Sequence, residues 1–198
     1  MRVAQMVQVG GLSRDLVAAI GRRGGRAVGL SGHDGGGWLR ASPRAHRDLE
    51  TGAVVDLGRV GDITGVDPTL PRSMLAAGLI PVIAPVAVDD QLESLNVNAD
   101  TVATSVAGAL GAARLVFLTD VAGICGPDGA LARELTVAQV KGWMADGTVS
   151  GGMIPKAEAC LAALAAGVER VTVADGRVEH AVLIELLTDA GVGTLIRR

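Results

Sequence analysis

Short apolar runs alternate along this chain with longer stretches rich in Ala and Leu. The short runs contain many Val and Ile residues, which favours β-strands, and the longer stretches have the length and spacing of helices. Strands are predicted at 26–30, 79–86, 114–119, 170–174 and 193–196, helices at 14–22, 68–77, 100–112, 136–145, 156–166 and 180–189, and residues 57–66 are ambiguous.

This alternation predicts an α/β fold. The run at 114–119 has almost no polar alternation, which predicts a strand buried on both faces, as in a parallel sheet. We therefore expect a three-layer α/β/α sandwich with a mainly parallel central sheet, formed by residues 1–198 as a single domain. In such folds, functional side chains gather where strands end at their carboxyl ends.

Composition narrows the functional classes. The net charge of −3 gives no support for a basic face that binds nucleic acid. No apolar run approaches the roughly 20 residues needed to span a bilayer, and the N-terminus lacks the pattern of a signal peptide. Cys125 and Cys160 are too few for a disulfide framework. We therefore expect a cytoplasmic protein that contacts neither nucleic acid nor membrane.

The basic residues are almost all arginine: of 18, only Lys141 and Lys156 are lysine. A lysine that persists in such a background favours a site that needs a compact ammonium group. Lys141 is equally consistent with an incidental residue.

Three segments carry the candidate chemistry. The first is 95–100 (LNVNAD), where two amides and a carboxylate precede a predicted helix. Asn96 offers both a donor and an acceptor to a polar substrate, and Asp100 is well placed to cap the helix or to organise nearby cations. An ordinary cap rich in Asn and Asp is the alternative, with about equal weight for any one of these residues.

The second segment is 118–124 (LTDVAGI), where a strand ends in Thr-Asp and a glycine turn. Backbone N–H groups of such a turn can face a phosphate, although spacing alone favours a plain β-turn. The third is 147–156 (GTVSGGMIPK), a glycine-rich loop that leads into a helix with Lys156 in its first turns. A phosphate site and a helix-entry loop with a surface lysine are equally favoured there. It lacks the Walker A spacing.

A fourth segment, 29–37 (GLSGHDGGG), also follows a predicted strand. Its spacing does not match the dinucleotide-binding fingerprint, and a loop leading into a hairpin at Trp38 is the better interpretation. A Rossmann-type oxidoreductase is therefore a minor alternative. The three histidines are scattered and propose no metal site.

Taken together, these segments resemble the acetylglutamate kinase family of bacterial arginine biosynthesis, in the amino-acid-kinase superfamily. The resemblance covers almost the whole chain. Its strongest strings, which occur in the family's order, are 96–100 (NVNAD), 118–121 (LTDV), 150–156 (SGGMIPK) and 174–178 (ADGRV). A related kinase of lysine biosynthesis, which acts on carrier-protein-bound aminoadipate, is expected to differ at the first and third strings and is placed second.

The resemblance implies ATP-dependent phosphorylation of the side-chain carboxylate of N-acetyl-L-glutamate, with Mg²⁺ accompanying ATP. It implies that Lys156 stabilises the transferring phosphoryl group, that Asp100 orients the catalytic lysines, and that Asn96 and Asn98 bind the substrate. The ATP-binding half would lie roughly in residues 100–198. The residues implied to line the ATP site are Thr119, Asp120, Val121, Ala122, Gly123, Ile124, Cys125, Thr148, Val149, Ser150 and Met153.

The family pattern also includes features that this sequence lacks. Family members begin with a strand, a lysine and glycine-rich loops ahead of the point where this chain starts, and these supply a second phosphate-binding lysine and a substrate-binding arginine. Arg2 is not clearly that arginine. We expect an N-terminally incomplete version of the family fold, and a non-catalytic nucleotide-binding fragment remains an alternative.

The resemblance further implies a homodimer or a higher homo-oligomer. Glu185 and the turn at 191–193 match positions that bind the inhibitor in arginine-sensitive members.

Overall fold

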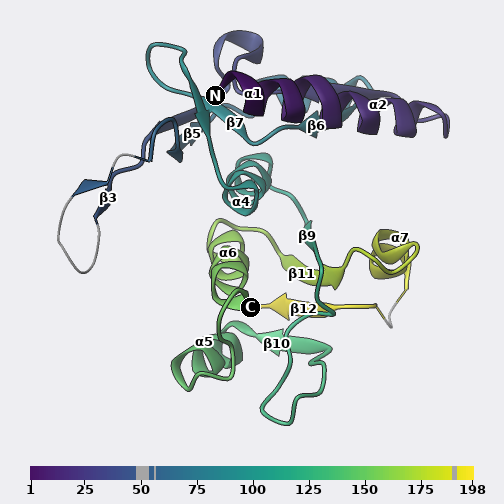
Figure 1. The fold of residues 1–198 in the computed structure, drawn as a ribbon. Coiled ribbons are helices and arrows are strands. Elements are labelled where there is room, and N and C mark those ends of the chain that lie inside the picture. Colours follow the sequence, from purple (N-terminus) through teal and green to yellow (C-terminus); the bar gives the residue numbers. More distant parts are fainter. Residues whose placement is uncertain (48–53, 56, 189–190) are drawn as a thin grey trace. The chain divides into compact units, whose positions relative to one another are not determined.

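The structure is a computed structural model that describes residues 1–47, 54–55, 57–188 and 191–198. The chain divides into two compact units, Met1–Val106 and Ala107–Arg198. The division falls inside helix α4 (Ala99–Leu110). Figure 1 shows the elements of each unit along the chain.

The first unit opens with one continuous helix. Its three parts are α1 (Arg2–Gln5), a π-helical stretch η1 (Met6–Leu12) and α2 (Ser13–Gly21). Only the last part was predicted from the sequence. The π-helical stretch, which contains Gly10 and Gly11, shifts the phase of the side chains, so the 3.6-residue period cannot be followed through it. Gly24, at a φ of +81°, ends the helix in the left-handed conformation that glycine tolerates best.

The strands of the first unit form three separate groups. β1 (Ala27–Leu30) pairs in parallel with β6 (Ile80–Ile83), next to α2 and α3 (Thr69–Ala76). A four-stranded sheet has the order β5-β2-β7-β8, with antiparallel, parallel and antiparallel neighbours. Its strands are β5 (Gly61–Val66), β2 (Leu39–Pro43), β7 (Val86–Val88) and β8 (Ser94–Asn96), and a small hairpin pairs β3 (His46–Arg47) with β4 (Val54–Val55).

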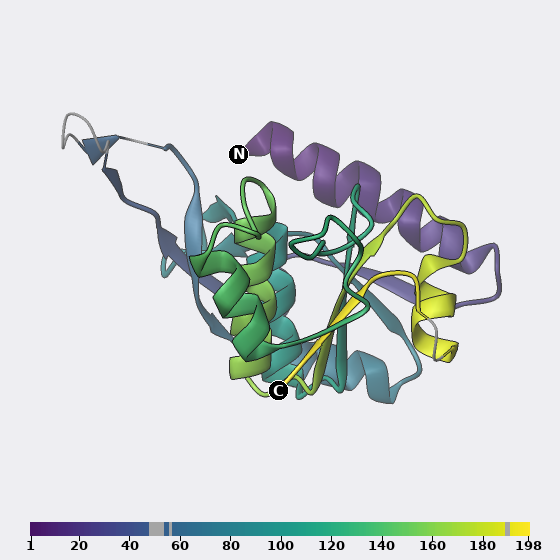
Figure 2. The ribbon, with the colours of Figure 1, turned by 90° about the horizontal axis from the view of Figure 1, so that it is seen from below.

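The second unit is built on one four-stranded sheet in the order β10-β12-β11-β9. Helices α5 (Val137–Ala145) and α6 (Met153–Ala165) lie on one face and α7 (Ala181–Leu187) on the other, as both views show (Figures 1 and 2). Its core consists of small aliphatic side chains such as Val171, Val173 and Leu164. The strands are β9 (Arg114–Thr119), β10 (Glu134–Thr136), β11 (Arg170–Asp175) and β12 (Thr194–Arg197).

The α/β class is confirmed, but a single mainly parallel sheet is not what the strand pairing gives. Among the described residues the pairing is mixed and divided into four groups. In the second unit, β11 runs parallel to β9 but antiparallel to β12. The predicted strand at 79–86 contains parts of two strands, β6 and β7, which belong to different sheets.

The expected burial of both faces of β9 is wrong. Phe117 is buried, but Leu118 is half exposed. Because β9 is the edge strand of its sheet, it has a neighbouring strand on one side only. By contrast, four consecutive residues of β11, Val171 to Ala174, are buried.

Candidate active site

Asn96 lies at the end of β8 in the first unit and is half-buried. Its backbone N–H donates to the carbonyl oxygen of Arg59 at 2.8 Å, and it pairs with Val86 of β7. Within the part of the chain that the structure describes, no hydrogen bond holds its side-chain amide. The amide is therefore available for a polar ligand, in an orientation set by the backbone.

The cap of helix α4 is formed by Asn98 and not, as expected from the sequence, by Asp100. The side-chain oxygen of Asn98 accepts the N–H of Thr101 at 3.1 Å, so Asn98 caps α4 and the expectation that Asp100 does so is wrong. A cap residue stands just outside the helix, and α4 begins one residue earlier than predicted. Asp100 is half-buried in the first helical turn, where a carboxylate is favoured by the helix dipole.

In the second unit, the carboxyl ends of β9 and β11 lie side by side. Thr119 is in register with Asp175, and the N–H of Gly176 donates to the carbonyl oxygen of Thr119 at 2.8 Å. The guanidinium of Arg177 donates two hydrogen bonds to Asp175, at 2.9 and 2.8 Å, and the backbone N–H of Arg177 donates a third at 2.9 Å. Together, with the guanidinium as the larger cause, they lower the pKa of that carboxyl group to about 2. Asp175 likewise raises the pKa of Arg177, and the charge of Asp120 adds to this effect.

The expected ATP-binding turn after β9 contains both exposed residues and residues that are fixed against β12. Asp120, Val121, Ala122 and Cys125 are exposed. Ile124 is buried, and its N–H donates to the Thr194 hydroxyl at 2.9 Å. Gly123, at a φ of +144°, passes so close to Thr194 that an added Cβ would lie 2.6 Å from the hydroxyl oxygen. The close approach requires glycine there.

The glycine-rich segment before α6 has a similar construction. The N–H of Thr148 donates to the Asp146 carboxylate at 2.9 Å, and the N–H of buried Val149 donates to the carbonyl oxygen of Trp143 at 2.7 Å. Ser150 is exposed, and Met153 and Lys156, in the first turns of α6, are half-buried. No side chain caps α6, and the space around the Cα atoms of Gly151 and Gly152 is open.

Trp143 connects these two segments, which sequence reasoning had treated separately. Its ring lies so near Gly126 that an added Cβ there would be 3.3 Å from it, while its carbonyl oxygen holds Val149. The chain has only two tryptophans, and this rarity is the one feature of the sequence that could have pointed to Trp143 as a link between the two segments. Arg177 was likewise missed as an individual residue, although it belongs to the fourth family-like string.

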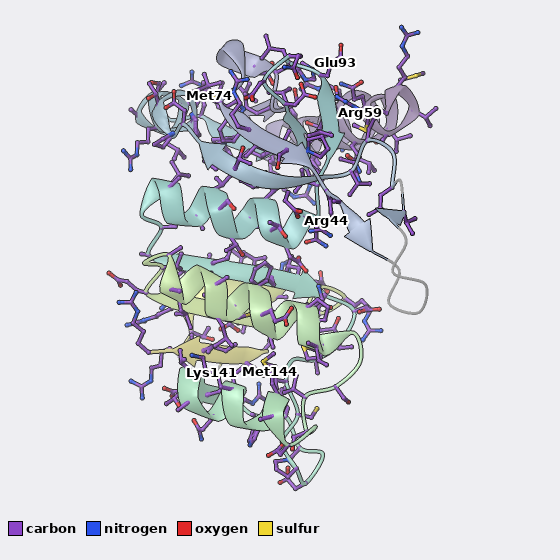
Figure 3. The ribbon with its side chains drawn as sticks, turned by 90° about the vertical axis from the view of Figure 1, so that its left-hand side faces the viewer. Arg44, Arg59, Met74, Glu93, Lys141 and Met144 are labelled. Carbon is purple, nitrogen blue, oxygen red and sulfur yellow. The ribbon has the colours of Figure 1, made fainter. Side chains whose placement is uncertain are left out.

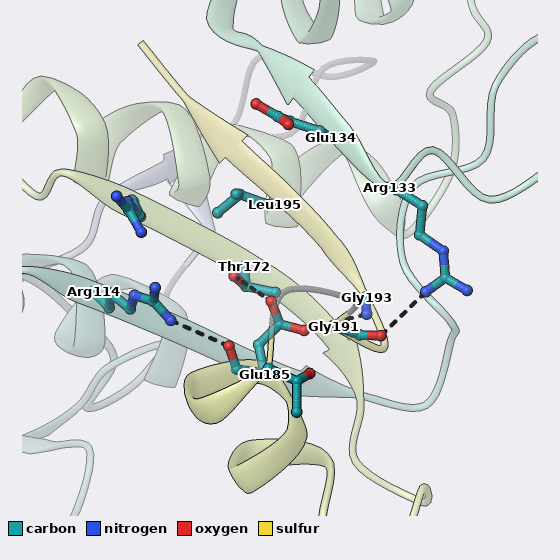
Figure 4. A pocket seen from close by; sticks show the side chains of 10 residues that line it. Arg114, Arg133, Glu134, Thr172, Glu185, Gly191, Gly193 and Leu195 are labelled. Atoms are coloured by element: carbon teal, nitrogen blue, oxygen red, sulfur yellow. Dashed lines mark hydrogen bonds between the residues drawn. The ribbon is translucent and has the colours of Figure 1, made fainter.

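A cavity of about 200 Å³ lies elsewhere in the second unit, and Arg114, Arg133 and Arg170 are in its lining. Figure 4 shows this cavity from close by. Glu185, Gly191 and Gly193, which the family resemblance associates with an inhibitor, also line it. The Glu185 carboxylate is buried and accepts hydrogen bonds from the hydroxyl of Thr172 and the N–H groups at 192 and 193. Both of its oxygens therefore already have hydrogen-bond donors within the protein.

Among the described residues, no three His, Cys, Asp or Glu side chains are grouped as metal ligands, and no helix has the length and apolar character to cross a membrane. Cys125 is exposed and Cys160 is buried, and the structure forms no disulfide between these two described residues.

Comparison with known proteins gives the class of this one. Residues 1–175 match the amino acid kinase family, and the chain belongs to it. Its sequence relatives include the acetylglutamate kinases of Novosphingobium aromaticivorans, 48% identical over 98% of this chain and 67% of the relative, and of Symbiobacterium thermophilum, 48% identical over 99% and 68%. The chain thus spans about two thirds of the length of the curated relatives it matches.

Solved structures agree on the fold. The N-acetylglutamate synthase of Neisseria gonorrhoeae, solved with coenzyme A and N-acetyl-glutamate, superposes with a TM-score of 0.83 at 28% identity, over 100% of this chain and 43% of its own. Carbamate kinase of Giardia lamblia superposes with a TM-score of 0.67 at 14% identity, over 96% of this chain and 71% of its own, and supports the fold alone.

Proposed function

We propose that this protein is an acetylglutamate kinase. It transfers the γ-phosphoryl group of ATP to the side-chain carboxylate of N-acetyl-L-glutamate and forms N-acetyl-L-glutamyl 5-phosphate, a step of arginine biosynthesis. The observation that carries the proposal is 48% identity to acetylglutamate kinases over nearly the whole chain.

Phosphoryl transfer needs alignment of the reactants and neutralisation of the charge that develops on the phosphoryl oxygens. In this proposal Lys156 supplies a positive charge beside that group, and Asp100 orients the catalytic cations. Asn96 binds acetylglutamate through its available amide. Asn98 keeps its amide N–H₂ group for the substrate while its oxygen caps α4.

The second unit fits an ATP site. Exposed residues at 120–122 and the open glycine pair Gly151 and Gly152, just before α6, offer N–H groups to phosphates. Mg²⁺ accompanies ATP and neutralises its phosphate charge. In the absence of a three-ligand acidic cluster among the described residues, the phosphates and water are its expected main ligands.

We also infer a homodimer or higher homo-oligomer, supported by an apolar stripe on the N-terminal helix. Val3, Met6, Val7, Leu12 and Leu16 are each at least 52% exposed. Contiguous exposed apolar side chains of this kind mark interaction surfaces.

We also propose that the fold is a three-layer α/β/α sandwich. The helices on both faces of the second unit's sheet support this architecture.

A coupled assay of ADP release tests the function. It is run on the 198-residue chain and on a form that carries any in-frame upstream coding sequence of its gene, with acetylglutamate and with an aminoadipate-type substrate. Turnover with acetylglutamate is expected. No turnover with acetylglutamate in either form would overturn the proposal, and preference for aminoadipate would favour the lysine-pathway kinase. Calorimetric ATP binding without any turnover would support a non-catalytic nucleotide-binding fragment.

A further inference from the structure

Arg59 holds both ends of the turn between β7 and β8. Its side-chain Nε donates to the carbonyl oxygen of Ser94 at 3.0 Å, and its Nη2 donates to the Asp89 carboxylate at 3.0 Å. The same nitrogen lies 4.0 Å from Glu93, next to which Figure 3 shows Arg59. A planar guanidinium can make these contacts together because its donors are fixed in a fork.

The backbone of Arg59 contacts the same strand. Its carbonyl oxygen accepts the N–H of Asn96 at 2.8 Å, and Val60 forms a parallel bridge with Asn96. Arg59 therefore binds β8 at two points, through its side chain at Ser94 and through its backbone at Asn96. β8 is only three residues long and is the last strand of its sheet, so these bonds cover the edge that β7 leaves unpaired.

Asp89 makes this arrangement rigid. It is nearly buried, and its carboxylate also accepts the backbone N–H groups of Gln91 at 3.1 Å and Glu93 at 2.8 Å. Burial would raise the pKa of Asp89, but these hydrogen bonds and the one from Arg59 lower it below its ordinary value. Leu92, inside the turn, has a φ of +60°, a conformation unfavourable for leucine that the surrounding bonds must maintain.

We propose that Arg59 is a positioning residue for the side-chain amide of Asn96, which binds the substrate. It acts through β8 and the turn at 89–93 and makes no contact with substrate. Since no bond from the described residues holds the Asn96 side chain, the direction of its amide depends on the backbone that Arg59 fixes. This proposal rests on the proposed function, in which Asn96 binds acetylglutamate.

Steady-state kinetics of Arg59→Met, which keeps much of the aliphatic stem, tests it. The KM for acetylglutamate is expected to rise about tenfold or more, the scale of a lost charge-assisted hydrogen bond. The KM for ATP is expected to stay within about twofold, because the residues that Arg59 binds are not among those implied to line the ATP site. Arg59→Lys should recover only part of the loss, because one ammonium replaces two forked contacts. Arg44→Met is the matched control, because Arg44 forms an exposed ion pair with Asp62 in the same unit.

Two further measurements separate positioning from general damage. Asp89→Asn removes the ion pair from the other side and should give the same KM signature. Hydrogen exchange at the Asn96 N–H should accelerate in Arg59→Met but not in Arg44→Met, whether or not turnover is measured. The proposal would be overturned if the KM for acetylglutamate were unchanged in folded Arg59→Met and folded Asp89→Asn. It would also be overturned if the KM for acetylglutamate and the KM for ATP rose equally in these variants. If the unmodified protein does not turn over acetylglutamate, the proposed function fails, and unchanged exchange at Asn96 would then also refute the positioning.

Discussion

At the scale of single residues, the two lysines of this chain form a natural comparison. Lys156 is half-buried in the first turns of α6, four positions after the open glycine pair, and Lys141 is exposed on α5 (Figure 3). Both carry the same charge on the same flexible stem, so any difference between them comes from their surroundings.

We predict that Lys156→Arg lowers kcat at least tenfold and leaves the melting temperature nearly unchanged. The wider guanidinium keeps the charge but misplaces it in a confined site, and one electrostatic contact to a reacting group is worth about 10²–10³ in turnover. Lys141→Arg is the control and should be silent. A Lys156→Arg enzyme with unchanged kcat would remove this lysine from the mechanism.

The ion pair between Asp175 and Arg177 gives a pH prediction. The folded state lowers the pKa of Asp175 from its ordinary value of 3.8 to about 2, so the pair stabilises the protein above the ordinary value and loses this effect as pH falls toward 2. Arg177→Ala should therefore be less stable than the unmodified protein at neutral pH, by a difference that shrinks between about pH 4 and 2. Urea midpoints and NMR titration of the Asp175 carboxyl measure this. A carboxyl group that titrates near 3.8 in the unmodified protein would refute the pairing.

At the scale of elements, helix starts were placed well where a cap follows a recognisable pattern. Thr136 and Gln139 exchange the reciprocal bonds of a capping box, and α5 begins one residue after Thr136. At α4 two cap-forming side chains stand two residues apart, Asn98 and Asp100, and the pattern cannot choose between them. The choice depends on where the preceding strand, β8, releases the backbone.

Substitutions at Asn98 separate its two roles. Asn98→Ala should lower the free energy of unfolding by about 1 kcal/mol, because it removes the cap of α4. Asn98→Asp keeps an oxygen in the cap position but loses the amide N–H₂ group, so stability should persist while the KM for acetylglutamate rises. Thermal unfolding and the ADP-release assay measure the two effects. An Asn98→Asp variant with unchanged KM would leave Asn98 as a cap alone.

At the scale of the whole molecule, the main feature is the apolar stripe of exposed side chains on the N-terminal helix. Scattered exposed leucines are common on proteins, but side chains gathered along one helix are not. The stripe includes residues from all three parts of the helix, η1 among them, so no single helical period reveals it in the sequence.

We predict that the protein is at least dimeric and that the double substitution Leu12→Glu, Leu16→Glu lowers its mass in light scattering to that of the monomer. Two carboxylates in an apolar interface lose hydration without gaining partners. Leu75→Glu, at a half-exposed position on α3, should leave the mass unchanged. A monomeric unmodified protein would contradict the proposed assembly, and a double variant that stays dimeric would place the interface elsewhere.

The sequence by itself determined the α/β class, most of the helices and the segments in which chemistry is expected. Local information suffices for these, because hydrophobic period, β-branched content and glycine-rich turns act over a few residues. The strings at 96–100, 118–121, 150–156 and 174–178 indicated the family for the same reason: each is a short contiguous pattern.

Only the tertiary structure decided how the strands pair and which side chains meet. The mixed sheets, the exposure of Leu118 on an edge strand and the contact of Trp143 with Gly126 all depend on partners distant in sequence. The link from Arg59 to Asn96 is of the same kind, since the two residues stand 37 positions apart in the sequence. A hydrophobic or charged residue shows in the sequence that it needs a partner, but the pairing depends on the packing of the whole unit.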